Sequence, residues 1–179
     1  MEHPLKKFLS LGLLALLSGC GGGGPAALNA PTTVSFYGDS ITGGQVANIV
    51  RGDFIGLDYA TGGQHSDTPL NPADTASVVV IRYGLADVAH GLAPSQTRAN
   101  VEILVAQVKA LGKRPIVVNV SYTPSGIERP VNAALAGLVD IDVSDIRGGL
   151  VDELHPDEAF YALLNDRIHD ELVRLVGVR

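Results

Sequence analysis

The sequence predicts an α/β protein of three layers, in which helices cover both faces of a mostly parallel sheet of about five strands. Two observations predict this fold. Short apolar segments alternate along the chain with segments whose apolar residues recur at helical spacing. The clearest strand-like segments, 77–83 and 115–120, are almost continuously apolar, as parallel strands buried on both faces require. The length of 179 residues suits a single domain.

Shorter β-branched and apolar segments predict the rest of the sheet. The first, 33–37, runs directly into Gly38-Asp39-Ser40, which is typical of a buried strand that ends in a loop. Weaker strands are expected at 54–59 and 138–143. Because parallel strands end at the same edge of a sheet, the loops that follow them are expected to lie together.

Two amphipathic helices are expected between and after these strands. The first has Ser95 or Thr97 available as its N-cap. Its apolar stripe is Val101, Leu104, Val105, Val108 and Leu111. The second begins at Pro156-Asp157-Glu158, a helix-entry signal. Its stripe is Phe160, Leu163, Leu164, Ile168 and Leu172. Stripes of this kind are core, and we assign them no function.

The N-terminal segment has the features of an export signal. Lys6 and Lys7 precede an apolar run at 8–17, which is shorter than the roughly 20 apolar residues that span a bilayer. The run ends in Leu17-Ser18-Gly19-Cys20, which resembles a bacterial lipobox, where the Cys is lipidated and becomes the new N-terminus. An ordinary signal peptide with a chance Cys is the alternative.

The domain boundaries follow from this interpretation. We expect a lipoprotein signal peptide at 1–19, a Gly-rich tether at 20–31 that starts at the lipidated Cys20, and a single folded domain at 32–179. Acyl chains on Cys20 are sufficient for stable membrane anchoring. The expected location is the bacterial cell envelope, with the domain facing the periplasm.

Composition excludes several classes of function. The net charge of −6 and the scattered Lys and Arg residues argue against a nucleic-acid partner. A single Cys cannot form an internal disulfide framework or a zinc site, and no phosphate-binding loop with a Lys follows a strand. We therefore expect no cofactor and no metal.

Polar residues cluster in three of the expected loops, at 38–44, 84–87 and 152–155. Ser40 at a strand end is a weak nucleophile that needs an adjacent general base. His155 is the candidate base, and Asp152, three residues earlier, is placed to orient the imidazole. Taken separately, each pattern also fits a capping Asp and a surface His.

Taken together and in this order, the residues resemble the GDSL, or SGNH, hydrolase family. Gly38-Asp39-Ser40 matches its nucleophile block and Asp152-x-x-His155-Pro156 its closing block. The resemblance extends over 33–176 and implies a flavodoxin-like α/β/α hydrolase acting on an ester or thioester. It implies that Ser40 is the nucleophile, His155 the base and Asp152 the orienting carboxylate.

The other two blocks depart from the family pattern. The second block corresponds best to Thr61-Gly62-Gly63-Gln64-His65-Ser66-Asp67-Thr68, which puts Ser66 where the family has Gly. The third reads Gly84-Leu85-Ala86-Asp87, with Ala86 where the family has an oxyanion-binding Asn. The resemblance then implies an oxyanion hole made by the backbone N–H groups of Ser40 and Ser66.

Other residues are expected around the pocket without a settled role. The expected pocket residues are Asp39, Gly84, Ala86 and Asp87. The candidates by loop position to stand in for the missing Asn are Gln64, His65, Asn71 and Asn119. His65 and His90 otherwise fit solvated loop histidines. Arg82 fits two roles equally, lining the pocket with Tyr83 or pairing with Asp87.

These expectations combine into two functional hypotheses. The first is a membrane-tethered serine esterase that cleaves a short-chain carboxylic ester, such as an O-acetyl group on a cell-envelope glycan, through an acyl-enzyme on Ser40. The second is a binding or scaffold lipoprotein that keeps the fold without catalysis. Ala86 motivates the second hypothesis, while the intact Ser40, Asp152 and His155 speak against it.

Overall fold

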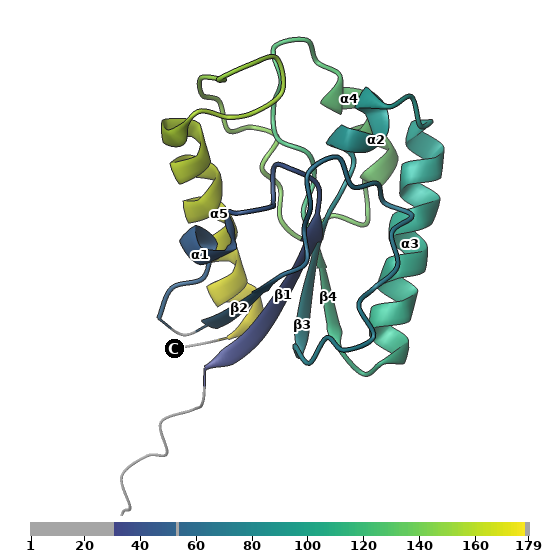
Figure 1. Ribbon diagram of the computed structural model, residues 1–179, viewed down its shortest axis with the longest axis vertical. Coiled ribbons are helices and arrows are strands. Elements are labelled where there is room, and N and C mark those ends of the chain that lie inside the picture. The colour runs from purple at the N-terminus through teal and green to yellow at the C-terminus, as the bar shows by residue number, and fades with distance from the viewer. Residues whose placement is uncertain (1–30, 53, 178–179) are drawn as a thin grey trace, which may run out of the picture.

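The computed structural model describes residues 31–52 and 54–177, which form a three-layer α/β/α sandwich (Figure 1). All the strands of its sheet are parallel, in the order β2-β1-β3-β4. The strands are β1 (Thr32–Gly38), β2 (Phe54–Asp58), β3 (Val78–Arg82) and β4 (Arg114–Val117). The helices are α1 (Val46–Ile49), α2 (Leu85–Ala89), α3 (Pro94–Ala110), α4 (Glu128–Leu135) and α5 (Glu158–Val176). The predicted fold class is confirmed.

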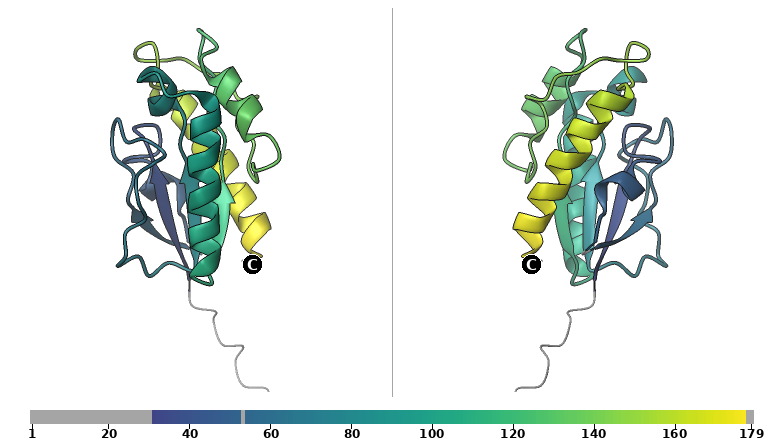
Figure 2. Two further views of the ribbon diagram at one scale, coloured as in Figure 1. Left: turned by 90° about the vertical axis from the view of Figure 1, so that its right-hand side faces the viewer. Right: turned by 90° about the vertical axis from the view of Figure 1, so that its left-hand side faces the viewer.

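Alternate residues of the strands build two hydrophobic cores, one on each face of the sheet. Figure 2 shows α3 in front of one face and α5 in front of the other. Val34, Phe36 and Val80 pack toward α1 and α5. Tyr37 and Ile81 pack toward α3 and α4. The continuous apolar strands of the sequence are therefore explained by burial on both sides.

The fifth strand, predicted at 138–143, is reduced to a single parallel bridge between Val118 and Ile141. Polar side chains take the hydrogen bonds that a ladder would use. The N–H of Val117 donates to Asp140 Oδ2 and the N–H of Val143 donates to Asn119 Oδ1, each at 2.8 Å. The named sheet therefore has one strand fewer than predicted.

Both predicted amphipathic helices are present, and the start of the first differs from the prediction. Neither Ser95 nor Thr97 is the N-cap of α3; Ala93 is, and Pro94 occupies the first helical position. Proline suits that position because its fixed φ matches the helix and its missing N–H would have no helical partner. Asp157 caps α5 as an acceptor for the N–H of Phe160 at 2.8 Å.

The N-terminal predictions lie outside the residues that the structure describes, apart from residue 31 of the tether. They include the signal peptide, Cys20 and the rest of the Gly-rich tether. Within the described part of the chain, no helix is long and apolar enough to cross a membrane.

Candidate active site

Figure 1 shows the turn that follows β1 at the edge of the sheet where the parallel strands end. Ser40 lies in this turn. Gly38 is required at the end of β1, because a Cβ there would lie 2.5 Å from the carbonyl oxygen of Arg82 and 2.5 Å from Thr42 Oγ1. The turn is closed by the N–H groups of Thr42 and Gly43, which donate to the carbonyl of Asp39. The sequence around Ser40 thus fixes the backbone that carries its hydroxyl.

A chain of hydrogen bonds joins Ser40 to residues near the opposite end of the polypeptide. Ser40 Oγ lies 2.8 Å from His155 Nε2, across 115 residues of sequence, and His155 Nδ1 lies 2.7 Å from Asp152 Oδ2. Because an ionised carboxylate only accepts, Nδ1 carries the imidazole proton. Nε2 then presents a lone pair to the Ser40 hydroxyl, which is the arrangement that activates a serine.

The loop that carries His155 is organised around Asp152. Asp152 Oδ1 accepts the backbone N–H groups of Leu154 and His155, each at 2.7 Å. These two bonds and the bond from the His155 ring lower the pKa of Asp152 to about 2. A backbone pairing between Leu150 and Pro156 closes the loop. Asp152 therefore stays charged across the neutral range and holds the imidazole in one tautomer.

Asp39, the second carboxylate of the site, has the opposite environment. It is 2% exposed, and its two oxygens accept the N–H groups of Ile41 and Ala86, each at 3.1 Å. Burial raises the pKa of Asp39, against the lowering effects of these hydrogen bonds and of Arg82. Asp39 therefore joins the turn after β1 to the first turn of α2.

Of the two roles expected for Arg82, pairing with Asp87 is not observed, and with Tyr83 it lines a small cavity that includes Asp39 but not Ser40. Its side chain is buried, and one guanidinium nitrogen donates to the carbonyl oxygen of Ile41 at 3.3 Å. The charge that acts most strongly on Arg82 is Asp39, and no ion pair joins it to Asp87 among the described residues. Tyr83 donates to Gln64 Oε1 at 3.4 Å. Both side chains pack beneath the site.

A cavity of about 320 Å³ opens beside Ser40 and His155. Most of its walls are glycine, alanine and leucine. The lining residues are Ser40, Gly62, Gly63, Leu85, Ala86, Ala89, His90, Leu154 and His155. The predicted residue Ala86 is among them, whereas Asp39, Gly84 and Asp87 are not. The nucleophile and the base thus face a small, mainly apolar space.

Gly84 and Asp87 support the cavity without lining it. Gly84 has a φ of 135°, and a Cβ there would lie 2.7 Å from Val131 and 2.9 Å from Val120. Only glycine fits this junction between β3 and α2. Asp87 is fully buried, and its Oδ1 accepts the N–H of Ser66 at 2.9 Å.

The hydrogen bond from the N–H of Ser66 to Asp87 Oδ1 contradicts the expectation that this N–H contributes to an oxyanion hole. Ser66 is fully buried and its N–H is already used by Asp87. Gly62 and Gly63 line the cavity instead, and a Cβ on Gly62 would lie 3.9 Å from Ser40 Cβ. The N–H groups of Ser40, Gly62 and Gly63 make no hydrogen bond to any residue that the structure describes.

None of the side chains proposed as substitutes for the missing Asn lines this cavity. Gln64 accepts from Tyr83, and Asn119 is bound to Asp142 and Val143. Asn71 Oδ1 accepts the N–H of Ala73 within its own turn. His65 contacts His90. Ala86 therefore leaves its part of the wall without a side-chain donor.

His90 is a cavity residue that the sequence did not single out as such. Its Nδ1 lies 2.8 Å from the carbonyl oxygen of Ala86 and 3.1 Å from His65 Nε2. Since a carbonyl only accepts, Nδ1 of His90 carries a proton, and the unprotonated Nε2 of His65 shares it. The spacing of one helical turn between Ala86 and His90 could have indicated from the sequence that both line the same cavity. In the same way, the two adjacent glycines Gly62 and Gly63 could have indicated a backbone that lies close to the site.

Among residues 31–52 and 54–177, no group of three or more His, Cys, Asp or Glu side chains is placed to hold a metal ion.

Solved structures share this fold across most of the chain, although no family model and no curated protein matches the sequence. A member of the lipolytic G-D-S-L family from Veillonella parvula has a TM-score of 0.64 at 14% identity, covering 83% of this chain and 100% of the other. The esterase EstA from Pseudoalteromonas sp. has a TM-score of 0.60 at 14% identity, covering 82% and 99%. The acetyl xylan esterase AlAXEase has a TM-score of 0.61 at 14% identity, covering 82% and 100%. The chain therefore has the fold of the lipolytic G-D-S-L acylhydrolases.

Proposed function

We propose that this protein is a serine esterase that hydrolyses a short-chain carboxylic ester through an acyl-enzyme on Ser40. The observation that carries the proposal is the hydrogen-bonded chain from Ser40 through His155 to Asp152. Folding does not require these three side chains to meet across 115 residues. The names of the two structural relatives that are esterases agree with this chemistry.

The proposed reaction has two halves. Ser40 Oγ attacks the ester carbonyl carbon while its proton moves to His155 Nε2, and Asp152 stabilises the imidazolium. The tetrahedral intermediate then collapses: the bond to the alcohol oxygen breaks, and His155 gives that oxygen its proton. In the second half, a water gives a proton to His155 as its oxygen attacks the acyl carbon. The bond from that carbon to Ser40 Oγ then breaks, His155 returns the proton to Ser40 Oγ, and the acid leaves.

The developing negative charge needs hydrogen-bond donors in this cavity. The N–H groups of Ser40, Gly62 and Gly63 are available for it. A backbone donor is already ordered before the reaction, so it costs little reorganisation. The absence of a side-chain donor at Ala86 is expected to lower turnover about 10²–10³-fold, or about 3–4 kcal/mol. The proposed enzyme therefore has a nucleophile, a base and backbone oxyanion donors, and its turnover is expected to be slow.

The size of the cavity favours a short acyl group. Its volume is about 320 Å³, and Leu85 and Leu154 are among the residues that line it. An acetyl group fits such a space and leaves its methyl in apolar surroundings, whereas a long fatty acyl chain needs an extended apolar groove. A small O-acyl group, such as an acetyl on a cell-envelope glycan, is the substrate we propose.

The location proposed for this activity is the cell envelope. Lys6, Lys7 and the apolar run that ends at Cys20 support it. Lipidation of Cys20 would hold the domain at a membrane surface, facing the periplasm. Replacing Cys20 with Ser is expected to release the protein from the membrane fraction, which fractionation and immunoblotting would detect.

The esterase proposal is tested with p-nitrophenyl esters of increasing acyl length. Acetate and butyrate should be hydrolysed and octanoate should not, because of the cavity size. Ser40→Ala should abolish hydrolysis with the thermal midpoint almost unchanged. Ser95→Ala, which removes an exposed hydroxyl on α3, is the matched control and should change neither quantity.

A second candidate function is a binding or scaffold protein on the same fold, and Ala86 is the observation that favours it. The two functions differ in one measurement. If hydrolysis is absent in the wild-type protein, or persists undiminished in Ser40→Ala, the esterase proposal is wrong and the binding function remains.

A further inference from the structure

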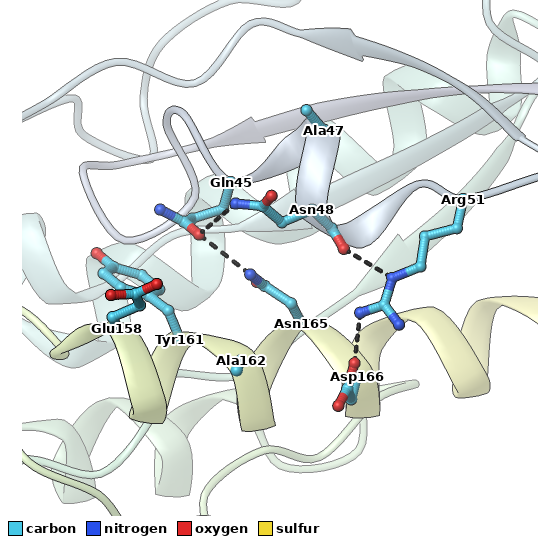
Figure 3. A pocket seen from close by; sticks show the side chains of 9 residues that line it. All are labelled: Gln45, Ala47, Asn48, Arg51, Glu158, Tyr161, Ala162, Asn165 and Asp166. Carbon is cyan, nitrogen blue, oxygen red and sulfur yellow. Dashed lines mark hydrogen bonds and ion pairs between the residues drawn. The ribbon is translucent and has the colours of Figure 1, made fainter.

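Two polar features lie outside the hydrogen-bonded chain that begins at Ser40. One is a cavity of about 630 Å³ between α1 and α5, where Figure 3 shows side chains bonded to one another, as Arg51 is to Asp166. This cavity shares no lining residue with the cavity beside Ser40. The other feature is the pair formed by His65 and His90, and His90 does line the cavity beside Ser40.

The two imidazoles of this pair face each other through nitrogen atoms. His65 Nε2 lies 3.1 Å from His90 Nδ1, and the ring centroids are 4.9 Å apart. No carboxylate is bonded to either ring in the part of the chain that the structure describes. A single proton, on His90 Nδ1, therefore lies between the two nitrogens. Imidazole nitrogens are the commonest protein ligands of transition metals.

The separation of the two nitrogens fits a metal ion as well as it fits a proton. Zinc lies about 2.0–2.1 Å from an imidazole nitrogen. Two such bonds to nitrogens 3.1 Å apart meet at an angle of about 100° at the ion, between the ideal octahedral and tetrahedral angles. An ion could thus bind both nitrogens with the rings nearly where they are.

The backbone around both histidines is held by one buried residue, Asp87. Its Oδ1 accepts the N–H of Ser66, the residue after His65, at 2.9 Å. Its carbonyl oxygen accepts the N–H of Leu92, two residues after His90, at 2.9 Å. Supporting hydrogen bonds of this kind fix the positions of ligands before an ion binds.

Little has to change when an ion replaces the shared proton. His90 then carries its proton on Nε2 instead of Nδ1, so both imidazoles stay neutral. The carbonyl oxygen of Ala86, 2.8 Å from His90 Nδ1, keeps the backbone N–H of His90 as its donor at 3.0 Å. His90 is exposed and His65 is half-buried, so an ion can arrive from solvent and keep water as its other ligands.

The electrostatic surroundings of the pair favour a cation. Tyr83 donates to Gln64, the residue before His65, at 3.4 Å. Burial raises the pKa of Tyr83, and the negative charges of three carboxylates raise it further. These carboxylates are Asp39, Asp67 and Asp87. The same charges attract a cation to the neighbouring imidazoles.

We infer that His65 and His90 form a binding site for a divalent transition-metal ion of the class of Zn²⁺, Ni²⁺ and Cu²⁺. Mg²⁺ and Ca²⁺ are not expected there, because they prefer oxygen ligands. The sequence predicted no metal because it has a single Cys, and it did not show that these imidazoles, 25 residues apart, meet.

The bound ion adds positive charge to the wall of the cavity beside Ser40. Ala86 lines the same wall one helical turn before His90 and supplies no side-chain donor. Positive charge there stabilises the oxyanion that the attack of Ser40 creates. This effect on turnover rests on the proposed function, whereas binding of the ion does not.

The binding test is isothermal titration calorimetry with ZnCl₂ on the full chain, made without a His tag and with Cys20→Ser to remove the thiol. One ion per chain is expected, and MgCl₂ should give no binding. His65→Ala and His90→Ala should each weaken Zn²⁺ binding at least about 10-fold. His155→Ala and His169→Ala are the matched controls and should leave the affinity unchanged. Absence of Zn²⁺ binding, or binding that survives in His65→Ala and is lost in a control, overturns the inference.

The ligand atoms are tested by long-range ¹H–¹⁵N NMR spectra of the histidine rings. Zn²⁺ should shift the signals of His65 Nε2 and His90 Nδ1 and leave those of His169 unchanged. Shifts at other ring nitrogens alone would overturn the assigned site.

The kinetic test compares hydrolysis of p-nitrophenyl acetate after treatment with EDTA and at saturating Zn²⁺. We expect kcat to rise about 10-fold with Zn²⁺ in the wild-type protein and not to change in His65→Ala. A fall in kcat, or an equal change in both proteins, overturns the effect on turnover. A protein that binds Zn²⁺ at the pair but hydrolyses no ester in either state contradicts the esterase proposal alone.

Discussion

The two sides of Ser40 differ in how completely they are built. On one side, His155 and Asp152 form a continuous hydrogen-bonded chain with distances of 2.7–2.8 Å. On the other side, Ala86 offers no side-chain donor, and the N–H of Ser66 is taken by Asp87. Ser40 is therefore hydrogen-bonded to a potential base, while in the proposed reaction the charge created by its attack would meet backbone N–H groups alone. The comparison teaches that the Ser40–His155–Asp152 hydrogen bonds are formed even though Ala86 supplies no side-chain donor on the other side.

The two carboxylates of the site show the same division of roles. Hydrogen bonds lower the pKa of the exposed Asp152 to about 2, whereas burial raises the pKa of Asp39. Asp152 is hydrogen-bonded to the imidazole, and Asp39 joins the turn after β1 to the first turn of α2 through backbone N–H groups. Environment, rather than residue type, therefore decides how the pKa of each carboxylate is shifted.

The largest effect on turnover is expected on the side of Ser40 that carries His155 and Asp152. His155→Ala removes the group that takes the proton of Ser40, and kcat for p-nitrophenyl acetate should fall about 10⁴-fold or more. Steady-state kinetics measure this fall, with the thermal midpoint as the check on folding. His169→Ala, a second histidine that is hydrogen-bonded to the carbonyl oxygen of Ile49 on α1, is the control for general loss of a His. A fall in His155→Ala no larger than in His169→Ala would exclude His155 as the base.

An intermediate effect on turnover is expected on the other side of Ser40, where Ala86 lines the cavity. Ala86→Asn places a carboxamide in the wall of the cavity beside Ser40, where it can donate to the oxyanion. We expect kcat for p-nitrophenyl acetate to rise about 10-fold, which is part of the 10²–10³ that such donors contribute elsewhere. Ala89→Asn, at another alanine of the same wall, is the matched control and should give no increase. A lower kcat in Ala86→Asn would mean that the oxyanion is bound in another geometry.

The smallest effect concerns stability and sharpens the contrast between the two carboxylates. The pKa of Asp152 is below the ordinary value of 3.8, so its charge stabilises the folded state above that pH and this contribution is lost as the pH falls toward 2. Asp152→Asn should therefore have a lower thermal midpoint than wild type at pH 6, and the gap should narrow by pH 3. Calorimetry at the two pH values measures the gap. A gap that widens on acidification would contradict the assigned hydrogen bonds.

Much of the fold could be predicted because the strands and long helices are determined by periodicity. The apolar segments that became β1, β3 and β4 are buried on both faces, and the stripe around Leu104 packs on one of them. The fifth strand was overpredicted because Asp140 and Asn119 use their side chains where a strand would use its backbone. Local hydrophobicity does not report that competition. The short helices α1, α2 and α4 carry too few residues for a periodic signal.

The residues of the candidate site also fall into those that the sequence predicted and those that it did not. Ser40, Asp152 and His155 were predicted because each lies in a sequence block with a definable chemical role, and the structure brings the three together. Gly62, Gly63 and His90 were not, since their roles depend on which loop faces Ser40 in three dimensions. Ser66 was misassigned because a backbone N–H says nothing in the sequence about which acceptor it meets.

The most direct test of the activated serine is reaction of the purified protein with a fluorophosphonate, followed by intact mass and peptide mapping. This probe labels an activated serine even when the substrate of the enzyme is unknown. We predict one adduct, on Ser40, that is absent in His155→Ala and reduced in Asp152→Asn. A folded wild-type protein that forms no adduct at Ser40, or forms it equally well in His155→Ala, would contradict the proton-transfer chain on which the proposed function depends.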